Sequence, residues 1–163
     1  MWMLFLCVFP PLFSGEMIDL NIGDATMKTS FHVPVEKIYP LDITFEFPSV
    51  EARLSDQIVG DRYNEDCNGD IRYEEIPEIR RTGLGRPIPF RIVVRKKADE
   101  SIVLDRTIVS LCITSHGGKD KVRTIGYLPL AIGDYVAEVM NLEKQAGLAG
   151  VKTTIGLYGG HGK

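Results

Sequence analysis

The chain has 163 residues, with 19 lysine and arginine side chains against 22 aspartate and glutamate side chains, so its formal charge is −3 at neutral pH. This charge excludes a general nucleic-acid-binding protein, which needs a strongly basic surface. A hydrophobic fraction of 44% and a charged fraction of 25% are typical of a globular domain. They exclude a disordered tail, a collagen-like repeat and a polytopic membrane protein.

The first 15 residues predict a secretory signal peptide. Residues 1–13 contain no charged side chain, and Ser14 and Gly15 then provide the small side chains of a cleavage region. This apolar run is shorter than the roughly 20 residues of a membrane-spanning helix, so we expect no stable membrane span. The alternative is a buried N-terminal strand or hairpin. A signal peptide predicts a periplasmic or secreted protein with one domain over residues 16–158 and a flexible tail over residues 159–163.

Two strands and one helix are predicted next along the chain. Large apolar residues occupy every odd position over residues 39–47, which is typical of a strand with one buried face. Residues 31–35 show the same alternation, and a hairpin around Lys37 would join the two strands. A single short helix is predicted over residues 50–59, where apolar residues recur every four positions. Ser49 can cap the start of this helix, and the glycine at position 60 can end it.

The segment 64–75 matches the spacing of the twelve-residue calcium loop of the EF-hand. Gly69 falls where such a loop turns sharply. The alternative is a polar turn without metal, because Pro77 obstructs the helix that should follow the loop. A calcium ion bound here would be structural, and no other cofactor is expected. The predicted ligands of this possible calcium site are Asn64, Asp66, Asn68, Asp70 and Glu75.

Export would leave Cys67 and Cys112 as the cysteines of the mature chain, because Cys7 lies within the signal. Two cysteines in an oxidising compartment can form a disulfide. The closed loop would span 45 residues, for which chain entropy predicts a stabilisation of up to about 4 kcal/mol. The alternative is two separate thiols, one of them in a core strand, because nothing in the sequence brings the two Cα atoms within bridging distance.

No catalytic site is expected. Cys112 and His116 could form a nucleophile and base, with Ser110 or Ser115 near the same histidine, but a cysteine in a strand is typical of a core or a disulfide. The sequence has no Gly-x-Ser-x-Gly, His-Glu-x-x-His, Cys-x-x-Cys or phosphate-binding motif. We therefore expect a protein that is not an enzyme.

The second half of the chain predicts further strands. Seven basic residues lie within positions 80–97. They indicate either an anionic partner or the solvent-exposed face of a strand. Apolar segments rich in β-branched and aromatic residues, separated by turn-forming residues, lie at residues 90–94, 102–108, 109–114, 122–128, 135–142 and 153–157. Seven or eight short strands of this kind predict an all-β fold, an antiparallel, immunoglobulin-like β-sandwich with one short helix.

Several motifs in this half are grouped in a recognisable order. They are Pro-Ile-Pro at 87–89, Ile-Gly at 125–126, then Leu130, Gly133 and Tyr135, and finally Leu148 and Gly150 before Ile-Gly at 155–156. In these motifs the chain resembles an uncharacterised family of exported bacterial β-domains, domain-of-unknown-function family 5625. The resemblance implies an exported β-sandwich and no particular activity. Independently, a tyrosine such as Tyr135 at a strand start after Gly133 is typical of a tyrosine corner, so we assign both residues a structural role.

Three functional hypotheses remain open. The leading one is an exported protein-binding β-sandwich domain without catalytic activity, for example an immunity-type inhibitor whose acidic residues 61–78 face the basic cleft of an envelope toxin. The second is a calcium-stabilised envelope module that binds a glycan or small ligand. The third is an enzyme that uses Cys112 and His116.

Overall fold

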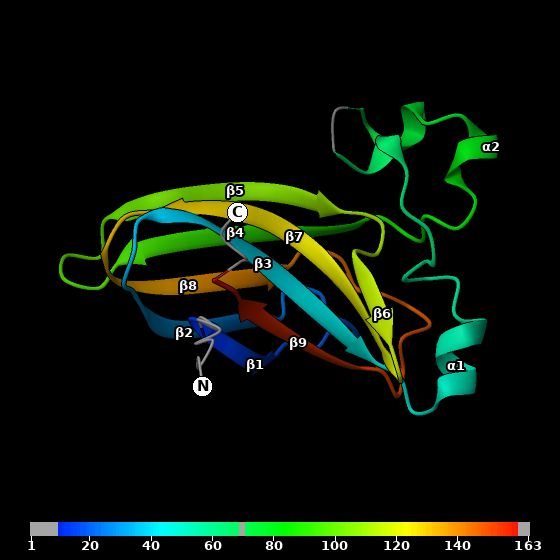
Figure 1. Cartoon of the computed structure of the whole chain (residues 1–163), viewed down its shortest axis with the longest axis horizontal. Coiled ribbons are helices and arrows are strands. Elements are labelled where there is room, and N and C mark those ends of the chain that lie inside the picture. Colours follow the sequence, from blue (N-terminus) through cyan, green and yellow to red (C-terminus); the bar gives the residue numbers. More distant parts are fainter. Residues whose placement is uncertain (1–9, 69–70, 160–163) are drawn as a thin grey trace, which may run out of the picture.

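Two antiparallel β-sheets pack face to face and form a β-sandwich (Figure 1). The computed structural model describes residues 10–68 and 71–159. One sheet contains, in spatial order, β1 (Phe13–Met17), β9 (Lys152–Leu157), β3 (Lys37–Glu46), β7 (Asp120–Leu130) and β6 (Ser115–Gly117). The other contains β2 (Thr26–Val33), β8 (Gly133–Asn141), β4 (Ile88–Lys96) and β5 (Ile102–Ser110). The predicted antiparallel β-sandwich is confirmed.

The core lies between the two sheets and follows the alternation seen in the sequence. The odd residues of β3 from Tyr39 to Phe45 are buried, and they share one core with the similarly buried Ile88, Phe90 and Ile92 of β4. Burying one such side chain contributes about 1.5–3 kcal/mol relative to leaving it exposed. Two tyrosines each donate a hydrogen bond to a backbone carbonyl four residues upstream. Tyr135 donates a hydrogen bond to the carbonyl of Ala131 (2.8 Å), and Tyr39 likewise bonds the carbonyl four residues upstream.

The predicted hairpin around Lys37 is wrong. Strand β2 pairs with β8, whereas β3 pairs with β7 and β9, so the two consecutive strands belong to different sheets. Residues 34–36 cross from one sheet to the other. Alternation shows which face of a strand is buried, but it does not determine which strand forms hydrogen bonds with it. Both strands still direct their apolar faces into one core.

The predicted strand over residues 109–114 is also wrong. Strand β5 continues to Ser110, and the backbone then turns at Cys112, whose φ of 66° is left-handed. The amide of Cys112 donates to the carbonyl of Leu84 (3.2 Å) instead of joining a sheet. Cys112 is therefore buried at a turn and not in a core strand.

Strand β1 extends back into the predicted signal peptide. Phe13 is buried against the ring of Phe31, with ring centroids 5.3 Å apart, and the amide of Leu12 donates to the carbonyl of Leu157 (2.8 Å). Cleavage directly after Gly15 would remove these contacts. Residues 1–9, which form most of the predicted signal, and residues 160–163 of the predicted tail lie outside the described residues.

The helices of the described residues are all short. Helix α1 (Val50–Ser55) covers only the first part of the predicted helix, and the Oγ of Ser49 caps it by accepting from the amide of Ala52 (3.0 Å), as predicted. Asp56 ends the helix. The others are η1 (Glu65–Asn68), η2 (Tyr73–Glu75) and α2 (Glu78–Arg81). None of the helices in residues 10–68 and 71–159 has the length and apolar character that crossing a bilayer requires.

Only Ile58 of the apolar stripe in the predicted helix packs on the sandwich, and it lies beyond the end of α1. Val50 and Leu54 are exposed, and Ala52 packs against the core in their place. The helix ends before Ile58, because the carboxylate of Asp56 accepts the amide of Ile58 (3.0 Å) and so replaces a helical hydrogen bond. A six-residue helix is too short to present a continuous stripe.

The carboxyl group of Asp42 provides a first test on the outer face of β3. It is half-buried and accepts a hydrogen bond from the hydroxyl of Thr124 (2.9 Å), and burial raises its pKa above the ordinary value. The folded state therefore binds the proton more tightly than the unfolded state, so this group makes stability fall as the pH rises from the unfolded pKa through the folded pKa. We expect Asp42→Asn to raise the melting temperature at pH 7 and to leave it nearly unchanged at pH 3.

Asp105 is the matched control for this measurement. A hydrogen bond from Arg91 lowers the pKa of Asp105, so its contribution is present above the unfolded pKa and is lost as the pH falls. Asp105→Asn should thus lower the melting temperature slightly at pH 7, opposite in sign to Asp42→Asn. Melting curves at pH 3 and pH 7 check both variants. An Asp42→Asn variant that melts lower than the unsubstituted protein at pH 7 would contradict the assignment.

Candidate binding lobe

The connection between β3 and β4 leaves the sandwich and forms a separate lobe at one end of the molecule (Figure 1). We define the lobe as residues 61–84; it contains η1, η2 and α2. Figure 1 shows these short helices beyond the end of β5. The base of the lobe is closed by backbone hydrogen bonds, because the amides of Asp61 and Arg62 both donate to the carbonyl of Gly83 (2.9 and 3.0 Å).

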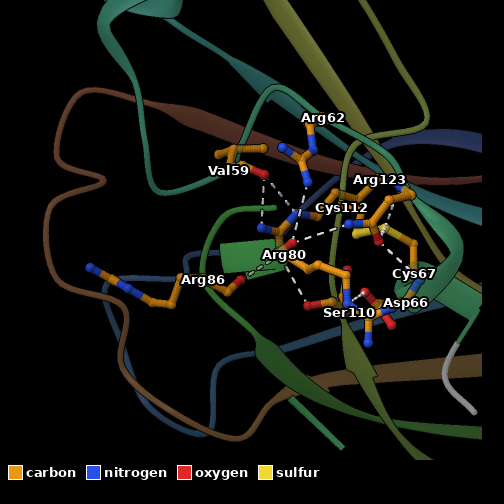
Figure 2. The surroundings of a disulfide bond; sticks show 10 residues. Val59, Arg62, Asp66, Cys67, Arg80, Arg86, Ser110, Cys112 and Arg123 are labelled. Carbon is orange, nitrogen blue, oxygen red and sulfur yellow. Dashed lines mark hydrogen bonds and ion pairs between the residues drawn. A yellow bond between two sulfur atoms is a disulfide. The ribbon is translucent and has the colours of Figure 1, made fainter. Parts of the chain in front are cut away.

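A disulfide between Cys67 and Cys112 joins the lobe to the turn after β5 (Figure 2). The two Cα atoms lie 6.0 Å apart. Around the bridge, the buried side chains of Ile76 and Leu84 form a small apolar cluster with Tyr73, separate from the core of the sandwich. The lobe is therefore attached to the turn after β5 by a covalent bond and by apolar contacts.

Arg123 of β7 holds the base of the lobe (Figure 2). Its side chain is fully buried, and all of its hydrogen bonds go to backbone carbonyls. Nε and Nη2 donate to Val59 (3.2 and 2.8 Å), and Nη2 also donates to Ile58 (3.2 Å). Nη1 donates to Arg86 (2.8 Å) and Ser110 (3.1 Å). One guanidinium thus ties both ends of the lobe's base to the end of β5.

Burial lowers the pKa of Arg123 to about 10, with a smaller opposing effect from the charge of Asp56. The guanidinium still carries its proton at neutral pH, so its N–H groups remain donors. Gly85 makes the close approach possible. A Cβ at position 85 would lie 2.5 Å from the carbonyl oxygen of Val59 and 2.6 Å from Nη2 of Arg123, and the φ of +83° also favours glycine.

A buried ion pair fixes the segment that leads into the lobe. Nζ of Lys121 lies 2.8 Å from Oδ2 of Asp56, and both side chains are almost fully buried. The same carboxylate accepts the amides of Ile58 and Val59, so its remaining lone pairs are occupied. Such a pair is compatible with burial because each charge is both paired and hydrogen-bonded.

The sequence analysis did not single out these anchoring residues. Lys121 and Arg123 lie at odd positions of β7, on the same face as the buried Ile125. The available signal was Arg123 within the predicted strand 122–128, at a position that alternates with apolar Ile125, because a charged group is buried only when it has partners. The partners themselves could not be named, since they are carbonyls in distant loops.

The lobe carries the net charge of the molecule. It contains seven acidic and four basic residues, which give −3, the same as the whole chain, so the remaining residues are balanced. Tyr63, Ile71 and Ile79 are exposed among these charges. Exposed aromatic and aliphatic side chains interspersed with arginines are typical of protein-binding surfaces.

Some of the predicted calcium ligands have other partners in the lobe. The carboxylate of Asp66 lies 3.5 Å from Nε of Arg80, and Nδ2 of Asn64 donates to the carbonyl of the same arginine (3.1 Å). Glu75 forms an ion pair with Arg72 (3.0 Å).

The side chains at positions 68–70, which include the predicted ligands Asn68 and Asp70, lie outside the described residues. Within residues 10–68 and 71–159, no three His, Cys, Asp or Glu side chains come together as a metal site. Calcium binding stays a prediction from the sequence.

The other candidate residues are dispersed. The ring of His116 lies 3.0 Å from Nη1 of Arg53, and the sulfur of Cys112 is in the disulfide, so in this form it offers no thiolate to that histidine. The predicted basic cluster is divided between two places. Arg80 belongs to the lobe, whereas Arg91 lies on β4 and pairs with a carboxylate of β5.

Comparisons with known proteins place the fold in a family. No curated protein sequence matches the chain. The structure resembles the crystal structure of GEBA250068378 from Sulfurospirillum deleyianum, with a TM-score of 0.63 and 16% identity over 90% of this chain and 95% of that chain. At this identity the likeness concerns the fold alone. The profile of DUF5625, a domain of unknown function, matches residues 16–159, in agreement with the motifs of the C-terminal half. The chain therefore belongs to the DUF5625 family.

Proposed function

We propose that this protein is an exported, non-catalytic β-sandwich domain that binds another protein through its lobe. The observation that carries the proposal is that the base of the lobe is held firmly while Tyr63, Ile71 and Ile79 are exposed. We call these three residues the exposed tip. Arg123, the Cys67–Cys112 disulfide and the Lys121–Asp56 ion pair hold the lobe. Holding a surface in place before binding reduces the entropy lost on association, which favours affinity.

Export is the first part of the proposal, and two features support it. The N-terminal sequence is typical of a signal peptide. A disulfide persists in oxidising compartments and is rare in the cytosol. Intact mass spectrometry of the protein isolated from its source cells tests this part. We expect a chain that begins near Glu16, contains the disulfide and does not react with an alkylating agent; a chain that begins at Met1 with two reactive thiols would overturn it.

An immunity-type inhibitor is the finer version of the proposal. The lobe has a net charge of −3, and an acidic lobe is complementary to the basic active-site cleft of an envelope toxin. Such an inhibitor would be encoded beside its toxin. Co-expression with the neighbouring gene product in the envelope should protect the cells, and replacing Glu74 and Glu78 with lysine should abolish that protection.

Site-specific cross-linking tests whether the lobe is the binding surface. Tyr63 on the lobe and Tyr127 on the sandwich are 60% and 61% exposed, so they form a matched pair. Each is replaced in turn by the photoreactive residue p-benzoylphenylalanine, and the protein is expressed in its source cells. We expect irradiation to join one defined protein to position 63 and not to position 127.

A second pair of variants strengthens this test. Ile79→Ala removes an exposed apolar side chain from the lobe, whereas Ile132→Ala removes one from the turn between β7 and β8. The first should weaken the cross-link from position 63, and the second should leave it unchanged. The proposal fails if position 63 gives no adduct, or gives the same adducts as position 127.

A further inference from the structure

A groove of about 510 Å³ separates the lobe from the edge of the four-stranded sheet. One wall is the end of β5, with Thr107, Ile108 and Val109. The other wall belongs to the lobe and includes Tyr73 and Glu74. The groove therefore runs along the edge of a β-strand, where an extended chain can reach backbone hydrogen-bonding groups.

The β5 edge next to the groove has no second hydrogen-bonded strand, although β7 of the other sheet packs close to β5. In the described residues β5 pairs with β4 alone, and no other backbone hydrogen bond involves residues 103–109. In an antiparallel pair, every second residue of an edge strand directs its N–H and C=O groups away from the sheet. These groups are available to an added strand.

The half of this edge beside the groove lacks the charges that normally prevent strand addition, whereas Asp105 and Arg106 carry charges on the other half of β5. Natural proteins protect edge strands by making them very short or by placing charges on them. Among the other edges, β6 has three residues, β1 has five, and β2 carries the exposed charge of Lys28. The residues of β5 that line the groove, 107–109, carry no charge.

The charge of the groove indicates what kind of segment it accepts. Asp66, Glu74 and Glu75 outnumber Arg72 among the lining residues, so the lining is acidic. Asp66 is only 6% exposed, and its Oδ2 lies 3.5 Å from Nε of Arg80 without forming a hydrogen bond. Glu74 has no ion pair with any described residue. The carboxylate of Glu74, which is exposed, can accept donors from a basic ligand, and the buried charge of Asp66 adds to the negative potential of the groove.

We infer that the edge of β5 binds an extended, basic segment of the partner protein as an added β-strand. Backbone hydrogen bonds to β5 provide affinity, and side chains on one face of the added strand contact Tyr73 and Ile71 of the lobe. Lysine or arginine side chains of the segment reach Glu74, near the buried charge of Asp66. The inference rests on the proposed function, because the lobe forms one wall of the groove, and it adds the mode of binding and the chemistry of the ligand.

A displayed library of random twelve-residue peptides provides the probe. The oxidised protein is used to select binders, and the selected peptides are synthesised for affinity measurements. We expect sequences in which lysine or arginine alternates with β-branched residues. Bound peptide should shift the amide NMR signals of residues 107–109 more than those of β2.

Two lysine substitutions on the same strand form the control. Val109 beside the groove and Val103 at the far end of β5 are 56% and 42% exposed, so both tolerate a long polar side chain. Val109→Lys places a charge on the open edge and should weaken peptide binding by at least about tenfold. Val103→Lys should leave the affinity unchanged. Glu74→Gln, which keeps the shape of the groove, should weaken basic peptides about three- to fivefold.

The outcomes separate this inference from the proposed function. Selection of no peptides, of peptides without basic residues, or of peptides that bind equally to Val109→Lys would overturn the inference. If the partner that cross-links to position 63 binds the Val109→Lys variant normally, the lobe remains the binding surface and strand addition is excluded. If Val109→Lys alone abolishes partner binding while Ile79→Ala does not, strand addition stands and the exposed tip of the lobe is excluded.

Discussion

Arg123→Met is expected to lower the free energy of unfolding by about 3–5 kcal/mol, because it leaves buried carbonyl groups without donors. The guanidinium bonds the carbonyls of Val59, Arg86 and Ser110, which come from three separate segments. Methionine has a similar length and fills most of the space, so the expected loss comes from unsatisfied acceptors rather than from a cavity. Urea unfolding followed by circular dichroism measures it.

The local consequence of this substitution is a loosened base of the lobe. The amides of Asp61 and Arg62 donate to Gly83. Their rates of exchange with deuterium should increase in Arg123→Met relative to the unsubstituted protein, and this increase should be larger than that of the amides of the central strand β3. Arg123→Lys keeps the charge but lacks the forked geometry, so it should show most of the same loss of stability.

An arginine on the surface provides the control for this prediction. Arg91 lies on the outer face of β4 and bonds Asp105 in two places (3.0 and 2.8 Å). Because that pair is exposed, Arg91→Met should change stability little. If Arg123→Met unfolds at the same urea concentration as Arg91→Met, the carbonyl contacts of Arg123 do not stabilise the fold.

Removal of the disulfide has the second largest expected effect. The double variant Cys67→Ala/Cys112→Ala opens a loop of 45 residues, and the chain-entropy argument predicts a loss of about 4 kcal/mol. For a domain of this size the melting temperature should fall by roughly 8–16 °C. Calorimetry of the oxidised protein, the reduced protein and the double variant measures the change.

The effect should be concentrated in the lobe. The apolar cluster of Ile76 and Leu84 contains both cysteines of the bridge, whereas the core of the sandwich contains neither. Limited proteolysis should therefore cleave the reduced protein within residues 61–84 before the strands are cleaved. A reducing agent should have no effect on the double variant. Equal melting temperatures of the oxidised and reduced protein would contradict a stabilising role for the bridge.

The two effects bear on the proposed function, because both anchors hold the same lobe. If the lobe binds a partner, then Arg123→Met and the cysteine double variant should both weaken binding at temperatures where the sandwich is still folded. Neither residue is at the exposed tip, so this loss would come from a poorly ordered surface and not from a missing contact.

The candidate site could be only partly predicted from the sequence. The acidic composition of the segment after residue 60 was visible, and so were the two cysteines. The closed base of the lobe was not, because it depends on Gly83 meeting Asp61 across more than 20 residues. The predicted helix over 50–59 was too long because the carboxylate of Asp56 bonds the amides of Ile58 and Val59, and periodicity does not report such a competitor.

The sequence by itself determined the fold class and the family. Period-two alternation assigns β3 its buried face, Ser49 marks the start of α1, and the C-terminal motifs agree with the match to DUF5625. These are local properties, which neighbouring residues encode directly. Only the tertiary structure decided which strands pair and where the lobe stands. The acceptors of Arg123 lie 13, 37 and 64 positions away along the chain, and contacts over such distances depend on how the whole chain closes.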